Sequence, residues 1–532
     1  MQKLQLFVLH EGGDTSSSEC LLRPLPNLSE DACSGDIVAW LTGDAKLHPG
    51  FHVAVFEAFK QYPQAVALYT DIAIEGRRIA RPAWSPTRVQ SAPGSSLPLV
   101  VRVRVLVDVG LLPADDGASL LSADAQFKVE AYLASTEMLV LHIPSVLISY
   151  PTSFTHPREQ LSGKVQSANT FRPPPQPIRS VQELLVRECQ PGNTLRPRPR
   201  HRSPCLRNQR RTSVVIPSAG VSLPGSETPL LENALNSLAL LDPLPQEVIV
   251  VVGDEYAAEV NISENMDSSM GSIVMFADVA DNLGVSVDSS LLDRVFVLYR
   301  GPGAFNFSFA INQGILAGKG EFVLLLNDDM EANTPDWLGR MAAHLRVPSV
   351  GAVGATLLYP NRTIQHIGIV IDDARPLHPF IGQRLEDVAS HNGDVARDVI
   401  SVTAACLLAR RRDLMTVGGM SEMFPLSFGD VDLCLKLRRL GLRVIVEPAA
   451  QLTHFESISR EPHIRKQEWD RYIHRWGEVI DPWYHPAFHR PDDLECLRLN
   501  VDHLDPVNQN GRWPVRNAMI RSQVHRSRVG SV

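Results

Sequence analysis

Short apolar runs and longer helical patterns alternate along the second half of the chain. The apolar runs are continuous and rich in β-branched residues, which is typical of strands that are buried on both faces. We predict strands at residues 213–217, 247–252, 295–299 and 321–326, and helices at residues 230–240, 308–317 and 334–345. Strands joined by helices predict a doubly wound α/β domain, in which ligands bind beyond the carboxyl ends of the strands.

A second pattern repeats along the chain. Residues 320–329 (GEFVLLLNDD) resemble residues 35–44 (GDIVAWLTGD) 285 positions earlier, and the same offset places residues 361–364 (NRTI) on residues 76–79 (GRRI). Two matches in one register indicate a tandem pair of related domains. Only 34 residues precede Gly35, so the first copy lacks room for a complete nucleotide-binding half.

A segment rich in proline and arginine separates the copies and shows a short helical pattern at residues 180–188. Seven arginines lie between Arg196 and Arg211 with no acid among them. They could face anionic lipid headgroups or a diphosphate-linked acceptor, although a solvated basic linker is the simpler interpretation. We predict a first domain at residues 1–170, a linker at 171–211, a second domain at 212–460, a helical extension at 461–505 and a flexible basic tail at 506–532.

Composition narrows the class of protein. The chain has 532 residues, of which 44% are hydrophobic and 21% charged, as in ordinary globular proteins with several domains. The net charge of −8 does not favour nucleic acid as a partner. The 7 cysteines are odd in number and lack CxxC spacing, which disfavours a disulfide framework and a structural zinc site.

The apolar runs also bear on location. No run is long enough to cross a bilayer, and the first residues do not have the pattern of a signal peptide. We therefore expect a cytoplasmic protein in a reducing compartment. Any membrane contact would be peripheral, at the inner face of the cell membrane.

Candidate chemistry begins with Asn327, Asp328 and Asp329, which end the last predicted strand of the second domain. Adjacent carboxylates repel each other unless a cation or hydrogen-bond donors compensate. Hard oxygen ligands suit Mg²⁺ or Mn²⁺, and these ions bridge diphosphate oxygens. The alternative is a turn in which Asn and Asp cap the next helix. This pattern alone leaves both interpretations open.

Two further segments carry candidate residues. Asp430 and Asp432 begin an amphipathic helix, where an acid is often only a cap. His454 follows a strand-like run, and a lone histidine there is more often structural than a ligand. His366 could line a pocket or simply pack.

As an ordered set, these segments resemble the family-two glycosyltransferases with the GT-A fold, in particular the bacterial branch that builds O-antigen and other surface polysaccharides. The resemblance runs through most of residues 212–460. The residues that carry it include TSVVIP at 212–217, FNFS at 305–308, LNDD at 326–329, IQHIG at 364–368, GDVD at 429–432 and His454.

The resemblance implies a GT-A catalytic domain with a Rossmann-like doubly wound sheet, preceded by a truncated, degenerate GT-A-like domain. In the DxD-type motif, Asn327 replaces the first acid. Asp329 and His454 would bind Mn²⁺ or Mg²⁺, and Asp430 would be the general base. The donor nucleotide would contact Pro217, Asp254, Glu255, Asn312, Asn327 and Asp328.

The implied activity is metal-dependent, inverting transfer of a sugar from a nucleoside-diphosphate donor. The donor would be a dTDP- or UDP-sugar, with rhamnose as one candidate, and the acceptor a growing cell-surface polysaccharide or lipid-linked glycan. In the first copy Thr42 and Gly43 replace the first two motif positions, and Tyr150 lies about where His454 should be. We therefore expect the first copy to be non-catalytic.

Two other functions remain open. A nucleotidyltransferase would share the sheet and the metal, but it needs a basic phosphate loop, and SAGVS at residues 218–222 offers no base. A non-catalytic glycan-binding or scaffold protein of a polysaccharide assembly complex is favoured by the decayed first copy and by Asn327.

Overall fold

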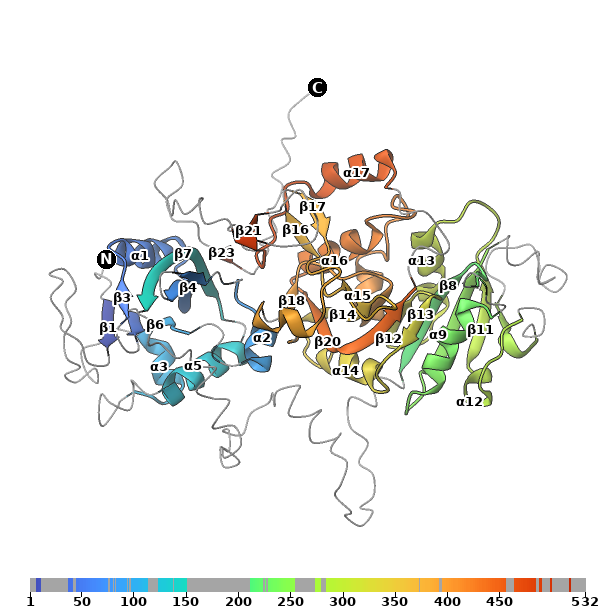
Figure 1. The fold of residues 1–532 in the computed structure, drawn as a ribbon, viewed down its shortest axis with the longest axis horizontal. Helices are drawn as coiled ribbons and strands as arrows, with labels where there is room; N and C mark the ends of the chain where they lie inside the picture. Colours follow the sequence, from blue (N-terminus) through green and yellow to red (C-terminus); the bar gives the residue numbers. More distant parts are fainter. Residues whose placement is uncertain are drawn as a thin grey trace, which may run out of the picture. The chain divides into compact units, whose positions relative to one another are not determined.

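In the computed structural model the chain divides into two compact units (Figure 1). The first comprises Met1–Glu188 and Pro482–Ala518, and the second comprises Cys189–Asp481 and Met519–Val532. The structure describes residues 6–10, 37–41, 45–74, 77–79, 81, 83–92, 94, 97–112, 123–136, 138–150, 211–222, 225, 228–253, 273–278, 284–372, 374–391, 395–455, 464–484, 488–489, 498–499 and 516–517.

The second unit is built on one mixed sheet. Its main path runs in the order β10 (Ile273–Met275), β11 (Val295–Tyr299), β9 (Glu247–Val252), β8 (Thr212–Ser218), β12 (Phe322–Leu326), β19 (Cys406–Arg410), β14 (Val350–Leu358), β20 (Arg443–His454) and β13 (Met330–Ala332). Strands β11, β9, β8 and β12 are parallel to one another, whereas β19 runs antiparallel between β12 and β14. Two short strands add to this path: β15 (Ile364–His366) pairs with β14, and β18 (Arg397–Val399) pairs with β20.

Helices cover both faces of this sheet because its strands are apolar on both sides. One core packs α9 (Leu230–Ala239) and α14 (Trp337–His344) against the sheet. The core on the other face packs α13 (Phe307–Ala317) and α16 (Gly429–Arg439). The predicted α/β class is thus confirmed, and each predicted strand and helix of this unit is present, with α14 beginning later than predicted.

The first unit has a sheet with a similar path. Its strands follow the order β1 (Leu6–His10), β2 (Ile37–Leu41), β6 (Val100–Arg102), β4 (Ala67–Ile74), β7 (Val140–Tyr150) and β23 (Arg516–Asn517), with β3 (Lys46–Leu47) on β7 and β5 (Arg77–Ile79) on β4. Strands β1 and β2 are parallel and β6 is antiparallel to both of its neighbours, which is the arrangement of β8, β12 and β19 in the second unit.

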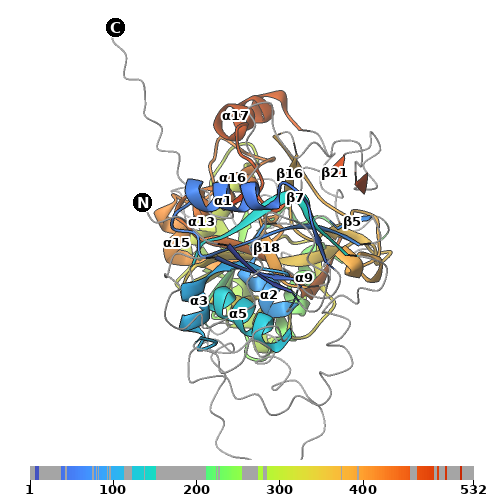
Figure 2. The same ribbon diagram turned by 90° about the vertical axis from the view of Figure 1, so that its left-hand side faces the viewer.

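The register of the two sheets also corresponds. Ile37 pairs with Arg102 in the first unit, as Phe322 pairs with Arg410 in the second. Helix α1 (Phe51–Gln61) covers one face of the first sheet, and α2 (Pro86–Ser91), α3 (Val103–Asp108) and α5 (Ala123–Ser135) cover the other, as Figure 2 shows.

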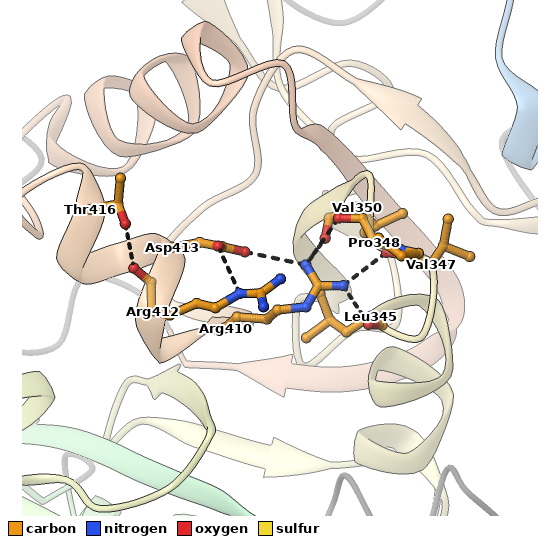
Figure 3. A network of polar contacts seen from close by, with 8 residues as sticks. All are labelled: Leu345, Val347, Pro348, Val350, Arg410, Arg412, Asp413 and Thr416. Carbon is orange, nitrogen blue, oxygen red and sulfur yellow. Dashed lines mark hydrogen bonds and ion pairs between the residues drawn. The ribbon is translucent and has the colours of Figure 1, made fainter. Parts of the chain in front are cut away.

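A buried arginine ties the sheet to a loop at this register position in both units. The Arg410 guanidinium donates to backbone carbonyls of the 345–350 turn, for example to Val347 O at 2.8 Å, and it lies 3.2 Å from Asp413 Oδ2 (Figure 3). In the first unit, Arg102 Nε donates to Ala65 O at 2.7 Å. The guanidinium of each arginine thus donates charged hydrogen bonds to backbone carbonyls beside the sheet.

The C-terminal part contains more regular structure than the sequence suggests. Helix α17 (Lys466–Trp476) lies in the predicted helical extension, followed by β21 (Phe488–His489) paired with β22 (Arg498–Leu499). Within the stretch for which we predict a flexible tail, β23 pairs with β7, whose edge offers unpaired backbone groups. The helical pattern at residues 180–188 lies outside the described residues. No helix in the described ranges is long and apolar enough to cross a membrane.

Candidate functional site

Asp329 and His454 meet at the end of the second sheet. Asp329 precedes β13, His454 ends β20, and Met330 pairs with His454 in an antiparallel ladder. The Phe455 amide donates to the Asp329 carbonyl at 3.1 Å, which closes this end of the ladder. As a result His454 Nε2 lies 3.1 Å from Asp329 Oδ1, with only 11% and 12% of the two side chains exposed.

Gln365 contacts the other ring nitrogen of His454. It lies on β15, is buried, and places its Oε1 2.5 Å from His454 Nδ1. The same amide donates from Nε2 to the His454 carbonyl at 3.5 Å. Both ring nitrogens of His454 therefore have fixed neighbours.

Asn327 completes this group of polar side chains. Its backbone amide donates to Ala405 O at 2.9 Å, and its Nδ2 lies 3.4 Å from His454 Nε2. Neither Asn327 Oδ1 nor Asp329 Oδ1 accepts a hydrogen bond, although both atoms are buried. Unsatisfied buried acceptors are costly, so a bound cation or donor would stabilise these two oxygens.

Asp328 points to a neighbouring strand. Its Oδ2 accepts a hydrogen bond of 2.7 Å from Ser218 Oγ, at the end of β8. Burial raises the pKa of Asp328 to about 6; the Ser218 bond opposes this shift, and the negative charge of Asp329 adds to it. The carboxyl ends of β8 and β12 are thus joined by a polar pair.

Asp430 lies in the first turn of α16 and is half-buried. Its carboxylate accepts from its neighbour Val431 N at 2.8 Å and from Ala404 N at 3.4 Å. Ala405, the next residue of the same loop, accepts the Asn327 amide. One short loop therefore connects the predicted base to the strand end that carries Asn327, Asp328 and Asp329.

Asp432, by contrast, is fully buried and structural. It accepts from Trp476 Nε1 at 2.9 Å and lies 3.3 Å from Lys436 Nζ and 3.2 Å from the Arg475 guanidinium. These contacts fasten α17 to α16. Asp432 is therefore removed from the chemistry that its neighbour Asp430 could perform.

His366 packs rather than lining an open surface. Its Nε2 faces the amides of Gly368 at 3.3 Å and Thr403 at 3.4 Å, and its Nδ1 lies 3.0 Å from His378 Nδ1. Burial holds the pKa of His366 well below its usual value, and the nearby His378, His454 and Arg397 act in the same direction. A neutral His366 thus supports the loop that contacts Asp430.

The other predicted residues that the structure describes make different contacts. Pro217 is buried in β8 and pairs with Val251. Asn312, on α13, accepts from Met420 N at 2.8 Å, and its Nδ2 donates to Met420 O at 2.9 Å and to Glu422 at 3.0 Å. Both ends of its amide thus hold the segment before α16, and a donor-binding role for Asn312 stays a prediction. Asp254 and Glu255 lie outside the described residues.

Sequence reasoning missed Gln365. The only available signal was its position beside His366 in the IQHIG segment, because nothing in the sequence shows that β15 lies next to the end of β20. Within the described part of the chain, no three or more His, Cys, Asp or Glu side chains are grouped as a ready-made metal site.

Comparisons with known proteins add a sequence relationship. No protein-family model matches the chain. It is 28% identical over 492 residues to the O-antigen biosynthesis protein RfbC of Myxococcus xanthus, covering 89% of this chain and 35% of that protein. It is also 38% identical over 237 residues to the uncharacterized protein y4gI of Sinorhizobium fredii, covering 42% of this chain and 24% of that protein. The chain thus spans about a third or less of the length of these relatives.

Solved structures with partial similarity were also found. A mannosyltransferase of Pyrobaculum calidifontis, in complex with GDP-Man and Mn²⁺, is 17% identical with a TM-score of 0.31, covering 48% of this chain and 60% of that one. GalNAc-T7 with UDP, GalNAc and Mn²⁺ is 11% identical with a TM-score of 0.35, covering 50% and 48%. The chain is therefore related in sequence, over most of its length, to a protein of O-antigen biosynthesis, and its second unit has the α/β class that the resemblance to GT-A glycosyltransferases predicts, with a sheet that is mixed.

Proposed function

We propose that this chain is a metal-dependent, inverting glycosyltransferase that moves a sugar from a nucleoside-diphosphate donor to a growing cell-surface polysaccharide or lipid-linked glycan. The observation that carries the proposal is the contact of 3.1 Å between Asp329 and His454 at the edge of the sheet. The loop at residues 403–405 joins this pair to Asp430. The relationship to a protein named for O-antigen biosynthesis supports the class of acceptor.

The side chains at this edge fit a divalent cation. Asp329 Oδ1 and Asn327 Oδ1 are buried acceptors without a hydrogen-bond donor, and His454 Nε2 lies beside both residues. Asp329 and His454 would hold Mn²⁺ or Mg²⁺, with further positions left for diphosphate oxygens, as is usual for such ions at phosphate sites. When bound, the ion would stabilise the negative charge that develops on the departing diphosphate.

Asp430 is proposed as the general base. Hydrogen bonds from Val431 N and Ala404 N fix the direction of its carboxylate. An ionised carboxylate can accept the proton of an acceptor hydroxyl as that hydroxyl attacks the sugar. A single displacement of this kind inverts the anomeric centre and needs no covalent glycosyl-enzyme.

The donor nucleotide is proposed to bind along the ends of β8 and β12. Ser218 and Asp328 form a polar pair there, and Pro217 and Asn327 lie beside them in the chain. We propose a dTDP- or UDP-sugar as donor, with rhamnose as one candidate. The place of action would be the cytoplasm, with peripheral contact at the inner face of the membrane where a lipid-linked acceptor is presented.

The test is donor turnover. Purified protein with Mn²⁺ is incubated with a panel of nucleotide sugars, and released nucleoside diphosphate is measured with and without chelator. The proposal expects release from at least one donor and its loss when the metal is chelated. A scaffold or glycan-binding role, which Asn327 in place of an acid would favour, predicts no turnover of any donor.

A further inference from the structure

The ring of His454 is held from both sides. Nδ1 lies 2.5 Å from Gln365 Oε1, while Nε2 lies 3.1 Å from Asp329 Oδ1 and 3.4 Å from Asn327 Nδ2. The shortest of these contacts is the one to Gln365. Only 5% of the surface of this residue is exposed, so its side chain has little room to turn away.

These neighbours differ in what they can donate or accept. An amide oxygen only accepts, so the contact with Gln365 Oε1 requires a proton on His454 Nδ1. A neutral imidazole with its proton on Nδ1 carries a lone pair on Nε2. The Asn327 Nδ2 group, which only donates, faces that lone pair and agrees with the same tautomer. Asp329 Oδ1, the nearer neighbour of Nε2, only accepts, so in this tautomer two acceptors face each other at 3.1 Å, and a cation bound to both would relieve their repulsion.

The other contacts of Gln365 also favour a fixed orientation of the His454 ring. Its own Nε2 donates to the His454 carbonyl at 3.5 Å, so one amide contacts both the ring and the backbone of the same residue. Strand β15, which carries Gln365, is itself fixed by pairing with β14. A histidine that binds a metal commonly donates its other N–H to an oxygen, which fixes the ring and its tautomer.

We propose that Gln365 is a positioning residue that holds His454 in the tautomer with the proton on Nδ1 and thereby presents Nε2, together with Asp329, to a divalent cation. This inference rests on the metal site of the proposed function. It assigns a role to a buried amide that the proposed function leaves unused.

The test measures Mn²⁺ binding by the full chain without any sugar donor, by following free Mn²⁺ with electron paramagnetic resonance. Gln365→Leu should raise the Kd for Mn²⁺ by about 10- to 100-fold. Gln365→Glu, whose side chain can only accept, should bind at least as tightly as the original protein. Gln451→Leu is the matched control, because Gln451 lies on β20 but donates to Pro448 O at 3.2 Å instead of contacting His454; it should leave the Kd unchanged.

A second readout reports the tautomer itself. In protein with ¹⁵N-labelled histidine, the His454 signals are identified by their loss in His454→Ala. The original protein should show a protonated Nδ1 and an unprotonated Nε2, and Gln365→Leu should shift this pattern toward a mixture. Thermal melting of each variant shows whether it is folded, and Gln365→Glu gives the answer if the leucine variant does not fold.

The outcomes separate two failures. If His454→Ala binds Mn²⁺ as well as the original protein, the proposed metal site itself is wrong. If His454→Ala loses binding while folded Gln365→Leu retains it with an unchanged tautomer, the metal site stands and the role of Gln365 is overturned. A Gln365→Glu protein that binds Mn²⁺ tenfold more weakly would also contradict the inference.

Discussion

The two units use the same sheet path for different purposes. In the second, Glu331 pairs with Thr453, and the next residue of β20 is His454. In the first, Lys46 pairs with Ser149, and the next residue of β7 is Tyr150. The register that brings a histidine to Asp329 in one unit therefore brings a phenol to the same position in the other.

The difference extends to the buried charges. In the first unit His142 Nε2 lies 3.0 Å from Asp71 Oδ1, and Arg81 N donates to the same carboxylate at 3.0 Å, so the acid is matched by donors inside the core. In the second, Asp329 Oδ1 lies 3.1 Å from His454 Nε2 but accepts no hydrogen bond from the backbone or from any side chain of the described residues. Two sheets with the same strand order place residues at equivalent positions. A binding site also requires polar groups that have no hydrogen-bond partner within the fold.

The largest expected effect comes from replacing the acid in the first turn of α16, compared with replacing the acid in the first turn of α5. Asp430 and Asp124 occupy the first turn of α16 and α5, and Asp124 is exposed. Asp430→Asn should lower kcat for donor turnover by about 10²- to 10⁴-fold, because the amide cannot accept a proton. Asp124→Asn should leave kcat unchanged. Equal losses in both variants, or none in either, would contradict the assignment of chemistry to the second unit.

Replacing Arg410 or Arg102, which occupy corresponding positions in the two sheets, should have a smaller effect, on the free energy of unfolding. Arg410→Ala should destabilise the second unit by about 3 kcal/mol, since several buried carbonyls of the 345–350 turn lose a charged donor. Arg102→Ala should destabilise the first unit by about 1–2 kcal/mol, because the carbonyls of Ala65 and Pro63 lose a charged donor.

Hydrogen exchange with mass spectrometry can follow each loop separately, at residues 345–350 and 63–66. Each substitution should speed exchange mainly in its own loop. Comparable changes in both loops after either single substitution would show that the two units do not unfold independently.

The smallest effect is a pH dependence of the second unit. Because the pKa of His366 is lowered in the folded state, that state binds fewer protons than the unfolded chain. The contribution of His366 to the free energy of unfolding is fully present above pH about 6.5, the pKa of histidine in an unfolded chain. This contribution is lost as the pH falls, by up to about 1.4 kcal/mol per pH unit.

Urea unfolding of the original protein and of His366→Gln at pH 7.5 and pH 5.5 measures this contribution. The variant should lose less stability on acidification, while His474→Gln, at an exposed position on α17, should behave like the original protein. An unchanged pH dependence in His366→Gln would show that other groups control it.

Local patterns predicted much of the fold, and tertiary contacts explain the rest. Continuous apolar runs identified β8, β9, β11 and β12, because strands buried on both faces leave that mark. The antiparallel β19 and the bulged pairing of β14 with β20 depend on contacts between segments about a hundred residues apart, which no local pattern encodes.

For the candidate site too, sequence patterns predicted some residues, and others emerged only from tertiary contacts. Asp329, Asp430 and His454 were found through the resemblance, and the structure brings Asp329 and His454 into contact. Gln365 and the loop at 403–405 were missed because their significance comes from proximity alone. The reverse holds for Asp432, whose sequence neighbourhood suggests chemistry but whose partners are Trp476, Lys436 and Arg475.

Crystals grown with Mn²⁺ and UDP test the central claim most directly, through anomalous diffraction at the manganese edge. The account predicts a manganese peak in the second unit, about 2.0–2.2 Å from an Asp329 carboxylate oxygen and from His454 Nε2. It predicts no peak beside Tyr150 in the first unit. A manganese ion bound elsewhere with Asp329 and His454 in direct contact, or a peak beside Tyr150, would contradict it.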